Sequence, residues 1–413
     1  MIEADLEIKE KEVFNTKELK QTTARKKSYS PPVISGFPKY IIARLMWLNI
    51  ALISLKYIWN PLKLLRAKKK MKSLLFQFLG THKILKLAKV DGHYYMDMYS
   101  TSWPSLAFNN YITGELNRVH PFKKTSTELR TMIFAITKKC PLRCEHCFEW
   151  DVLNGKEKLS LQDLKQILKK FQDRGVAQVQ LSGGEPLVRL NDMIELIKTA
   201  ETGTDFWILT SGYNLTLENA IKLKNAGLKG VAISLDHFEP ELHNKFRGFQ
   251  TAYEWVEKAV DNAHKAKLII SLTLCATKDF VSEANMMTYA QLAKGLGAAF
   301  IQVLEPRAVG HYSGKNVALS DEQLNVLEKF YLRLNYDPKF IDMPIVTYHG
   351  YHQRYMGCFG AGSRYLYIDT DGDLHACPFC QKKTGNVLSS STFEESLSTL
   401  KATGCHQFEN AAI

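Results

Sequence analysis

Three cysteines stand close together in the segment CPLRCEHC: Cys140, Cys144 and Cys147. Thiolates are soft ligands that select iron–sulfur clusters. Three cysteines can hold three irons of a cubane [4Fe–4S] cluster, so that the fourth iron has no protein ligand and is open to substrate chemistry. A structural zinc ion would need a fourth ligand, and His146, which could supply one, lies between two of the cysteines. The spacing therefore favours an iron–sulfur cluster with one open iron.

Short apolar runs alternate with amphipathic stretches over residues 131–305. The runs are rich in β-branched and aromatic residues, which is typical of parallel strands buried on both faces. They are MIFAIT, VAQVQLS, FWILTS, GVAISLD, LIISLTLC and AFIQVLE. The amphipathic stretches have apolar residues spaced by three and four, and Ser160 can cap the first of these helices. Because parallel strands require helical crossovers, the pattern predicts an α/β fold with a partial (β/α)6 TIM-like barrel.

Polar motifs follow several of these strands, at the end of an α/β barrel where active sites lie. The cysteine segment, SGGEP (residues 182–186), TSG (residues 210–212) and SLD (residues 234–236) all have this position. Taken singly, each motif also has a structural interpretation. The glycines can form a turn, Glu185 can be a solvated charge, and Ser234 and Asp236 can cap the next helix. Their common position predicts a single site.

The order of these motifs resembles the radical S-adenosylmethionine (radical SAM) superfamily over about residues 130–310. In this resemblance SGGEP is similar to the GGE motif, which contacts the methionyl amino group of SAM. TSG resembles a TNG-type strand end with Ser in place of Asn, SLD resembles the ribose-side strand, and HNKFRG (residues 243–248) resembles the stretch that often follows. The implied SAM-binding residues are Gly183, Gly184, Glu185, Ser211, Ser234 and Asp236.

The resemblance also implies the reaction and its partners. An electron from the reduced cluster would cleave SAM into methionine and a 5′-deoxyadenosyl radical, which abstracts a hydrogen atom from a substrate. This implies an oxidoreductase or maturase-type enzyme and a reductant such as flavodoxin or ferredoxin. Glu305 at the end of the sixth strand would face the barrel mouth, and five further residues are substrate-pocket candidates because His and Tyr can exchange protons. They are Tyr348, His349, Tyr351, His352 and Tyr355. Residues of both types are also often packed in place.

A second set of cysteines lies beyond the barrel: Cys358, Cys377, Cys380 and Cys405. The Cys-x13-Gly-x4-Cys spacing resembles the opening of the SPASM and twitch domains, which carry auxiliary [4Fe–4S] clusters in radical SAM enzymes. The segment RYLYIDTDGDLHAC predicts a β-hairpin that turns at Asp-Gly. Four cysteines suit a single cluster, with Cys405 as the fourth ligand. Four cysteines with one CxxC pair are also typical of structural zinc, so both metals stay open here.

The N-terminal region is basic and apolar. Residues 19–90 contain sixteen Lys and Arg and no Asp or Glu. The longest uncharged run in the apolar segment 41–59 has eleven residues, fewer than the about 20 that span a bilayer. After Pro61 the sequence predicts a basic amphipathic helix. Its apolar face would consist of Leu64, Ala67, Met71, Leu75 and Phe78. This helix can attach to an anionic membrane surface or cap the barrel with solvated lysines. Nucleic-acid contact is disfavoured, because no recognised binding module accompanies the basic residues.

Composition limits the organisation and the compartment. The 413 residues allow two or three domains, and the net charge is +12 at pH 7. Seven of the eight cysteines fall in the two metal-spaced sets, which indicates a reducing compartment, hence the cytoplasm, with peripheral membrane contact as an option. The eighth, Cys275, is predicted to be a buried apolar residue. The first thirty residues lack the apolar core of a secretory signal.

The sequence thus predicts three parts and leaves the substrate open. Residues 1–128 form a basic, partly amphipathic region, residues 129–340 a radical SAM barrel and residues 341–413 an auxiliary-cluster domain. A hairpin is expected in LAKVDGHYYMDMY and a helix in WPSLAFNNYITGEL. The SPASM and twitch resemblance favours a peptide or protein substrate. The N-terminal region favours a lipid or another membrane-located molecule. The non-enzymatic alternative is a zinc-bearing interaction protein with a decayed barrel, and the intact strand-end motifs argue against it.

Overall fold

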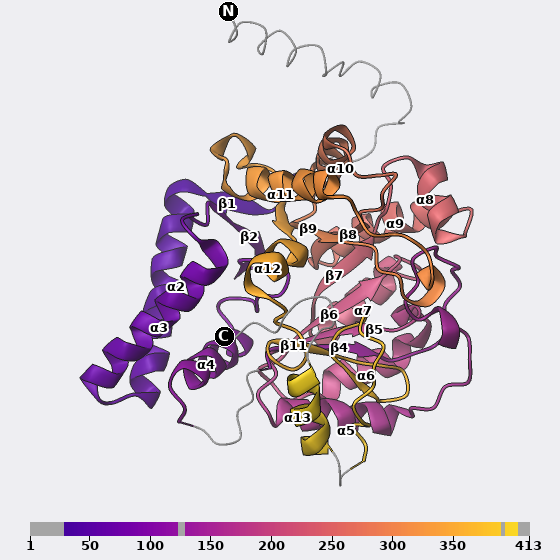
Figure 1. The fold of residues 1–413 in the computed structure, drawn as a ribbon. Coiled ribbons are helices and arrows are strands. Elements are labelled where there is room, and N and C mark those ends of the chain that lie inside the picture. Colours follow the sequence, from indigo (N-terminus) through magenta and orange to yellow (C-terminus); the bar gives the residue numbers. More distant parts are fainter. Residues whose placement is uncertain (1–28, 123–128, 390–392, 404–413) are drawn as a thin grey trace, which may run out of the picture.

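The computed structural model describes residues 29–122, 129–389 and 393–403. Cys405 and almost all of the segment in which no secretory signal was expected lie outside these residues. The described chain forms a curved sheet with helices outside it, and an N-terminal region stands against one side of the sheet (Figure 1).

A nine-stranded sheet forms the centre of the described part of the molecule, in the order β10-β9-β8-β7-β6-β5-β4-β11-β12. The six predicted strands are β4 (Thr131–Ala135), β5 (Gln178–Ser182), β6 (Asp205–Thr210), β7 (Leu228–Ser234), β8 (Ile269–Cys275) and β9 (Phe300–Leu304). They run parallel to one another, as do β10 (Ile345–Thr347) beside β9 and β11 (Tyr365–Ile368) beside β4. The short strand β12 (Leu374–His375) pairs antiparallel with β11. The partial TIM-like barrel is confirmed, and it has two more parallel strands than the sequence predicted.

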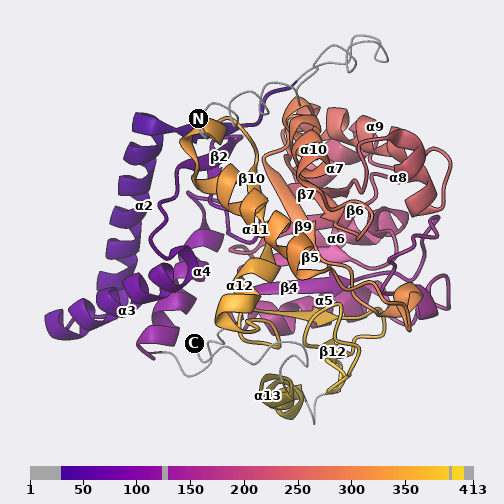
Figure 2. The same cartoon turned by 45° about the horizontal axis from the view of Figure 1, so that its top comes forward.

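The predicted crossover helices cover the outside of this sheet (Figure 2). They are α5 (Leu161–Gln172), α6 (Leu190–Thr199), α7 (Leu217–Ala226), α9 (Ala252–Lys265) and α10 (Glu283–Gly295), with α8 (Pro240–Arg247) between β7 and α9 and α11 (Asp321–Tyr336) after β9. Ser160 caps α5 as predicted, through a reciprocal pair of hydrogen bonds with Asp163. Gly227 ends α7 at a φ of 119°, a conformation that glycine adopts without a steric penalty.

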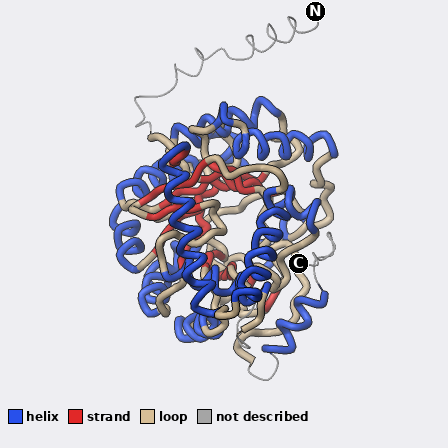
Figure 3. The backbone as a smooth tube through the Cα atoms, turned by 90° about the vertical axis from the view of Figure 1, so that its left-hand side faces the viewer, coloured by secondary structure: helices blue, strands red, loops and turns tan. Residues whose placement is uncertain are grey.

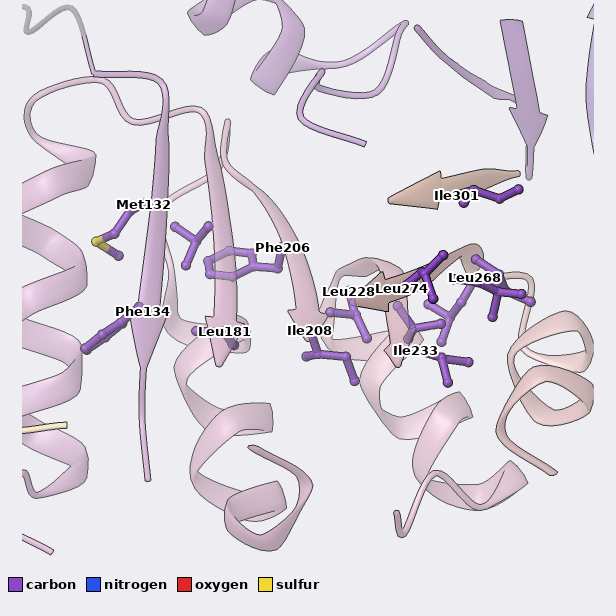
Figure 4. Packing of buried hydrophobic residues seen from close by; sticks show 14 of the residues in the cluster. Met132, Phe134, Leu181, Phe206, Ile208, Leu228, Ile233, Leu268, Leu274 and Ile301 are labelled. Atoms are coloured by element: carbon purple, nitrogen blue, oxygen red, sulfur yellow. The ribbon is translucent and has the colours of Figure 1, made fainter. Parts of the chain in front are cut away.

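Two different surfaces result from the alternation of side chains along the strands. Phe134, Leu181, Ile208, Ile233 and Leu274 are fully buried in the core between the strands and the outer helices (Figure 4). A second, separate cluster of buried residues lies at the bottom of the barrel, the end opposite the C-terminal ends of the strands. There Tyr95 and Met98 of the N-terminal region pack against the barrel residues Trp207 and Phe300. The N-terminal region therefore closes the bottom of the barrel, which leaves the strand ends as the open side.

The N-terminal region consists of three helices and a small antiparallel sheet. The helices are α2 (Gly36–Tyr57), α3 (Pro61–Leu79) and α4 (Leu106–Val119); the strands are β1 (Val33–Ser35), β2 (Lys86–Val90) and β3 (His93–Tyr95). The predicted β2–β3 hairpin and the predicted helix α4 are both confirmed. In the view onto the side where the N-terminal region lies, helices lie in front of the strands of the sheet (Figure 3).

The apolar face of α3 packs against the protein. Ala67 is buried together with Ile58 and Val119, and Leu64, Met71 and Leu74 pack around them. Leu75, which was predicted to lie on this face, is 39% exposed, because the helix turns Leu74 inward instead. This face of α3 therefore caps the protein, as one of the two interpretations expected.

Helix α2 is longer than its uncharged run suggested. Among the described residues it is the one helix with the length and apolar composition to cross a membrane, and only 11% of its most apolar stretch is buried. The count of consecutive uncharged residues missed this property, because Lys39, Arg44 and Lys56 interrupt the run without ending the helix.

Candidate active site

A cavity of about 470 Å³ opens at the C-terminal ends of the strands. Its wall brings together the cysteine triplet and the motifs that follow β5, β6 and β7, although these lie far apart in the sequence. The predicted site residues in this wall are Cys140, Cys144, Cys147, Gly183, Gly184, Glu185, Ser211, Ser234 and Asp236. Among the residues that sequence reasoning did not assign to the site, Tyr99, Arg247, Thr273, Gln302 and Arg307 also line it.

The cysteine loop that follows β4 is held in place by its backbone. The N–H of Arg143 donates to the carbonyl of Arg247 at 3.1 Å, and the N–H of Glu145 donates to the carbonyl of Phe246 at 3.0 Å. Leu142 and Cys144 are buried against Ala252 of α9. The HNKFRG stretch at the end of α8 therefore supports the loop that carries the three thiols.

The two glycines of SGGEP allow β5 to pass very close to the segment before Cys140. Gly183 has a φ of +130°, and a Cβ atom there would lie 2.4 Å from the carbonyl oxygen of Thr137. At Gly184 a Cβ atom would lie 2.4 Å from the carbonyl oxygen of Lys139. The N–H of Gly184 donates to the carbonyl oxygen of Thr137 at 2.8 Å. Glycine is required here because any side chain would push the cysteine loop away.

The Glu185 carboxylate is buried and connects β5 to the end of β6. It accepts hydrogen bonds from the hydroxyl of Thr210 at 2.7 Å, from the hydroxyl of Ser211 at 2.6 Å and from the N–H of Ser211 at 2.8 Å. It also accepts from the N–H of Leu187 at 3.1 Å. Burial raises the pKa of Glu185, and the Ser211 and Thr210 hydrogen bonds oppose that shift. Glu185 therefore positions Ser211 in the cavity wall and is not the solvated charge of the simpler interpretation.

Asp236 holds a buried arginine against the cysteine triplet. The Arg247 guanidinium donates to Asp236 Oδ2 at 2.6 Å and to the Sγ atom of Cys144 at 3.6 Å. Asp236 Oδ1 accepts from the N–H of Cys275 at 3.0 Å. Burial raises the pKa of the Cys144 thiol, and the positive charge of Arg247 opposes that shift. Sequence reasoning singled out the HNKFRG stretch but did not assign Arg247 to the site, because nothing in the spacing showed which of its side chains turns inward.

The predicted substrate-pocket residues divide between two cavities. Glu305 and His349 line the active-site cavity. Tyr348, His349 and His352 line a second cavity of about 270 Å³, which shares Tyr99, His349 and Tyr365 with the first. Neither cavity has Tyr351 or Tyr355 in its wall, and Tyr355 is 68% exposed.

Glu305 lies in a network of charged and phenolic groups. It accepts a hydrogen bond from the Tyr348 hydroxyl at 2.7 Å and forms an ion pair with Arg354 at 2.6 Å. Burial of the Tyr348 side chain raises its pKa, so the phenol is protonated at neutral pH. Burial likewise lowers the pKa of His349 to about 3, which makes its imidazole neutral.

The C-terminal cysteines approach the same cavity. Cys377 and Cys380 line it, with their Sγ atoms 3.5 Å apart. Cys358 is buried in the segment that precedes β11. No disulfide joins any two of the seven cysteines among the described residues. Within these residues no three His, Cys, Asp or Glu side chains gather closely enough for a single metal ion. The predicted hairpin with its Asp371-Gly372 turn is confirmed.

The donor set of the cysteine triplet suits a cluster larger than one ion. Three thiols line one cavity without converging on a point, and a guanidinium donates to one of their sulfur atoms. A hydrogen bond to a ligating sulfur is one of the ways in which proteins tune such clusters. The fold and this wall together define a partial α/β barrel enzyme whose chemistry lies at the strand ends.

Comparison with known proteins agrees with this class. The model of the radical SAM superfamily matches residues 134–281. A GTP 3′,8-cyclase of Rhizobium meliloti (strain 1021) is 30% identical over 276 residues, which cover 64% of this chain and 74% of that protein. An AdoMet-dependent heme synthase of Oleidesulfovibrio alaskensis is 26% identical over 300 residues, 67% of this chain and 76% of that one. Streptococcus suis SuiB bound to the precursor peptide SuiA has a similar fold, with a TM-score of 0.53 and 14% identity over 69% of each chain. The chain belongs to the radical SAM superfamily.

Membership fixes the general activity and the cofactors. Radical SAM proteins are enzymes that use a [4Fe–4S] cluster and S-adenosylmethionine, need a reductant and are generally cytoplasmic. The alternative of a zinc-bearing protein without enzymatic activity is therefore disfavoured.

Proposed function

We propose that Cys140, Cys144 and Cys147 hold the [4Fe–4S] cluster and that SAM binds beside it in the cavity of about 470 Å³. The convergence of the triplet and of the three strand-end motifs on one wall carries this proposal. Gly183, Gly184 and Glu185 would contribute the methionyl side of the SAM site, and Ser211, Ser234 and Asp236 would contribute the rest. When bound, the reduced cluster supplies the electron that cleaves SAM and so provides the radical that abstracts hydrogen from the substrate.

The chain's own residues would position and enclose these groups. Arg247 places a positive charge beside the Cys144 sulfur, and Asp236 fixes the orientation of that guanidinium. Glu185 keeps the end of β6 against the end of β5 through its hydrogen bonds to Thr210 and Ser211. The closed bottom of the barrel blocks entry of water from the opposite end of the strands, which would help to protect a reactive intermediate.

The favoured substrate is a peptide or a protein. Support comes from the similarity in fold to SuiB, which was solved with a precursor peptide. The Cys377–Cys380 segment forms part of the cavity wall, so a substrate would contact both the barrel and the C-terminal region. The sequence relatives carry names of GTP and heme chemistry, so this proposal for the substrate does not rest on them.

A lipid or another membrane-located molecule is the second candidate. The second cavity favours it, because its wall includes Leu75, Phe78 and Leu79 of α3 as well as the three residues that it shares with the active-site cavity. An apolar substrate could extend from the basic N-terminal helices toward the strand ends through this space. The same region carries no acidic residue between residues 19 and 90, which suits contact with an anionic surface.

The C-terminal cysteines would hold an auxiliary [4Fe–4S] cluster. Cys358, Cys377 and Cys380 would be three of its ligands and Cys405 the fourth. Zinc is the alternative metal, since tetrahedral zinc ligands lie about 3.8 Å apart and the Cys377 and Cys380 sulfurs are 3.5 Å apart. The domain division at residue 341 also stays a proposal, and β10 and β11 extend the barrel sheet beyond it.

The test is anaerobic reconstitution followed by measurement of iron, zinc and 5′-deoxyadenosine. The wild-type protein should hold about eight irons as two cubane clusters. Cys144→Ala should reduce this to about four irons and abolish SAM cleavage. The control Cys275→Ala should retain the iron of the wild-type protein, because Cys275 lies in β8 and belongs to neither cysteine set.

Three outcomes decide between the assignments. Continued 5′-deoxyadenosine formation by Cys144→Ala would contradict the cluster assignment. About four irons with one zinc in the wild-type protein would assign zinc to the C-terminal cysteines. For the substrate, peptide extracts and lipid extracts of the source cells should be compared for the rise in 5′-deoxyadenosine that each produces, since only a true substrate accelerates turnover.

A further inference from the structure

Helix α2 has an apolar outer face that nothing in the described structure covers. Its inner face packs on α4, where Met46 and Ile53 contact the cluster of Phe108, Ile112 and Leu116. The outer face has a stripe of six residues with exposed fractions between 42% and 88%, spaced by four and three: Ile41, Leu45, Leu48, Leu52, Leu55 and Trp59. We call these six residues the α2 stripe. A surface helix of a water-soluble protein normally has a polar outer face, so this helix requires a second partner.

The apolar surface is wider than the stripe. Phe37, Tyr40 and Trp47 are exposed by 74%, 52% and 41%. Together with Trp59, which is 88% exposed just beyond the end of α2, they give the helix four exposed aromatic residues along its length. Trp and Tyr, which make up three of these four, are enriched where proteins meet the boundary between lipid headgroups and acyl chains.

The charges of the two helices identify the kind of partner. Helices α2 and α3 contain nine Lys and Arg and no Asp or Glu. In α3 these include Lys63, Arg66, Lys69 and Lys72, all exposed to solvent. An apolar helix beside a row of cations matches a surface that is apolar below and negatively charged above, which is an anionic phospholipid bilayer.

A second copy of the chain fits this surface poorly. The spacing of the α2 stripe resembles a coiled-coil seam, and such seams are flanked by charges of both signs. Two copies would bring the same acid-free basic helices together, and like charges at close range destabilise association. The apolar face is also broader than the two positions per heptad that a seam uses, since Tyr40 and Trp47 lie beside it.

The packing of α2 determines its orientation. A membrane span is lipid-covered on most sides, but α2 contacts α4, β1 and β2 of its own protein. Withdrawing α2 into a bilayer would uncover Phe108, Ile112 and Leu116 of α4, on which Met46 and Ile53 pack. The helix is about 33 Å long, and it would lie along the membrane with its outer face downward.

We infer that α2 and α3 are an in-plane docking surface for an anionic bilayer. The α2 stripe enters the boundary of the acyl chains, and the Lys and Arg side chains of α3 contact the headgroup phosphates. This attachment is independent of the chemistry of the strand ends, so it stands whichever substrate the enzyme has. The sequence suggested that the apolar face of α3 could attach to a membrane. That face packs on the protein instead, so the inferred docking surface uses the outer face of α2.

The test is sedimentation of the reconstituted holoenzyme with lipid vesicles under anaerobic conditions. Wild-type protein should sediment with phosphatidylcholine vesicles that contain about 30% phosphatidylglycerol, and less with phosphatidylcholine alone. Leu48→Gln/Leu52→Gln should lower the partition coefficient at least about tenfold. The matched control Leu217→Gln/Ile221→Gln, which changes two exposed apolar residues of α7, should bind like the wild type.

A charge variant separates the two contributions. Lys69→Glu/Lys72→Glu should remove the preference for phosphatidylglycerol, whereas Lys222→Glu/Lys258→Glu, on α7 and α9, should not. Circular dichroism and SAM cleavage in solution should be unchanged in every variant, which shows that a loss of binding is not a loss of folding. Because binding is measured without turnover, an inactive enzyme that still binds vesicles would count against the proposed function alone.

Two results would overturn the inference. One is equal sedimentation of the wild type and Leu48→Gln/Leu52→Gln with anionic vesicles, or no sedimentation of either. The other is a dimer of the wild type in vesicle-free solution that Leu48→Gln/Leu52→Gln converts to a monomer, because the second copy would then be the partner of the α2 stripe.

Discussion

The Sγ atom of Cys144 lies next to a guanidinium that is itself fixed by a carboxylate, so three residues from three segments act together. Arg247 comes from α8, Asp236 follows β7, and Cys144 follows β4. The sequence identified the cysteines by spacing and Asp236 by resemblance. It did not identify Arg247 as their common partner, because that contact depends on how α8 packs against the cysteine loop.

His349 lies in the wall of both cavities, and the pKa of its imidazole is strongly lowered. Its ring lies 4.2 Å from the Tyr99 ring and 5.8 Å from the Tyr365 ring. Burial lowers its pKa from 6.5 to about 3. Between these two pH values the imidazole is neutral in the folded protein and protonated in the unfolded chain. Its contribution to stability is therefore complete above about pH 6.5 and is lost as the pH falls toward 3.

We predict that His349→Phe makes the protein less sensitive to mild acid. Between pH 6 and pH 4 the free energy of unfolding of the wild type should fall faster than that of the variant by on the order of 1.4 kcal/mol per pH unit. Urea unfolding at pH 6, 5 and 4 measures this difference. Parallel curves for the two proteins would mean that His349 does not stay neutral in the fold.

In addition to the ladder between β11 and β4, an ion pair with little solvent access attaches the turn of the β11–β12 hairpin to the barrel. Asp371 at its turn contacts Lys138 at 2.5 Å and Lys158 at 2.8 Å. The side chains of Lys138 and Asp371 are only 7% and 14% exposed, whereas that of Lys158 is 64% exposed. Burial alone would raise the pKa of Asp371. The hydrogen bonds from Lys138 and Lys158 outweigh this effect, so the pKa is lowered overall. The carboxylate is thus ionised at neutral pH and holds the cysteine-bearing hairpin at the end of β4.

Asp371→Asn should destabilise the protein by about 3 kcal/mol at pH 7, because it leaves Lys138 buried without its counter-charge. The difference from the wild type should shrink below about pH 4, where the carboxylate of the unfolded chain becomes protonated while that of the folded protein stays ionised to lower pH. Lys158→Ala is the matched control, and its exposed pair should contribute about 1 kcal/mol or less. Urea unfolding measures both changes, and equal effects of the two variants would contradict the importance of the buried contact.

The strands and helices of the barrel were largely predictable, and the reasons lie in their patterns. Each of β4 to β9 is a continuous apolar run followed by a helix with apolar residues on one face. The strands β10 and β11 were not predicted as parts of the barrel, because IVT has three residues and YLYI stands within a hairpin motif. Contacts between distant segments, such as the fit of Gly184 against Lys139, leave no periodic signal in the sequence.

The N-terminal helices and the barrel are one folded unit at the level of the whole molecule. Phe108, Ile112 and Leu116 of α4 lie under α2, and Phe78 of α3 packs against Phe359 and His352 of the barrel side. The sequence predicted either a cap or a membrane helix for this region. The structure has a cap on the inner side of these helices and an uncovered apolar surface on the outer side, so the two interpretations do not exclude each other.

Deleting residues 1–80 should therefore yield aggregated protein. The deletion exposes at least three large apolar side chains of α4, each of which contributes about 1.5–3 kcal/mol when buried. The soluble fraction after expression and the urea midpoint of any soluble protein are the measurements. A stable, active, soluble deletion protein would show that the cap is dispensable for folding. Substitutions on the outer face are consequently the better probe of membrane attachment.

The order of the large sheet places β10 and β12 at its two ends, so among the described residues no backbone ladder joins them into a full circle. The wall on that flank is made instead of side chains such as Phe78, Tyr99 and Tyr365, which line the second cavity. A ladder opens only by breaking several backbone hydrogen bonds, whereas aromatic side chains can swing through rotamer changes. One flank of the barrel can thus widen to admit a bulky molecule while every strand keeps its register.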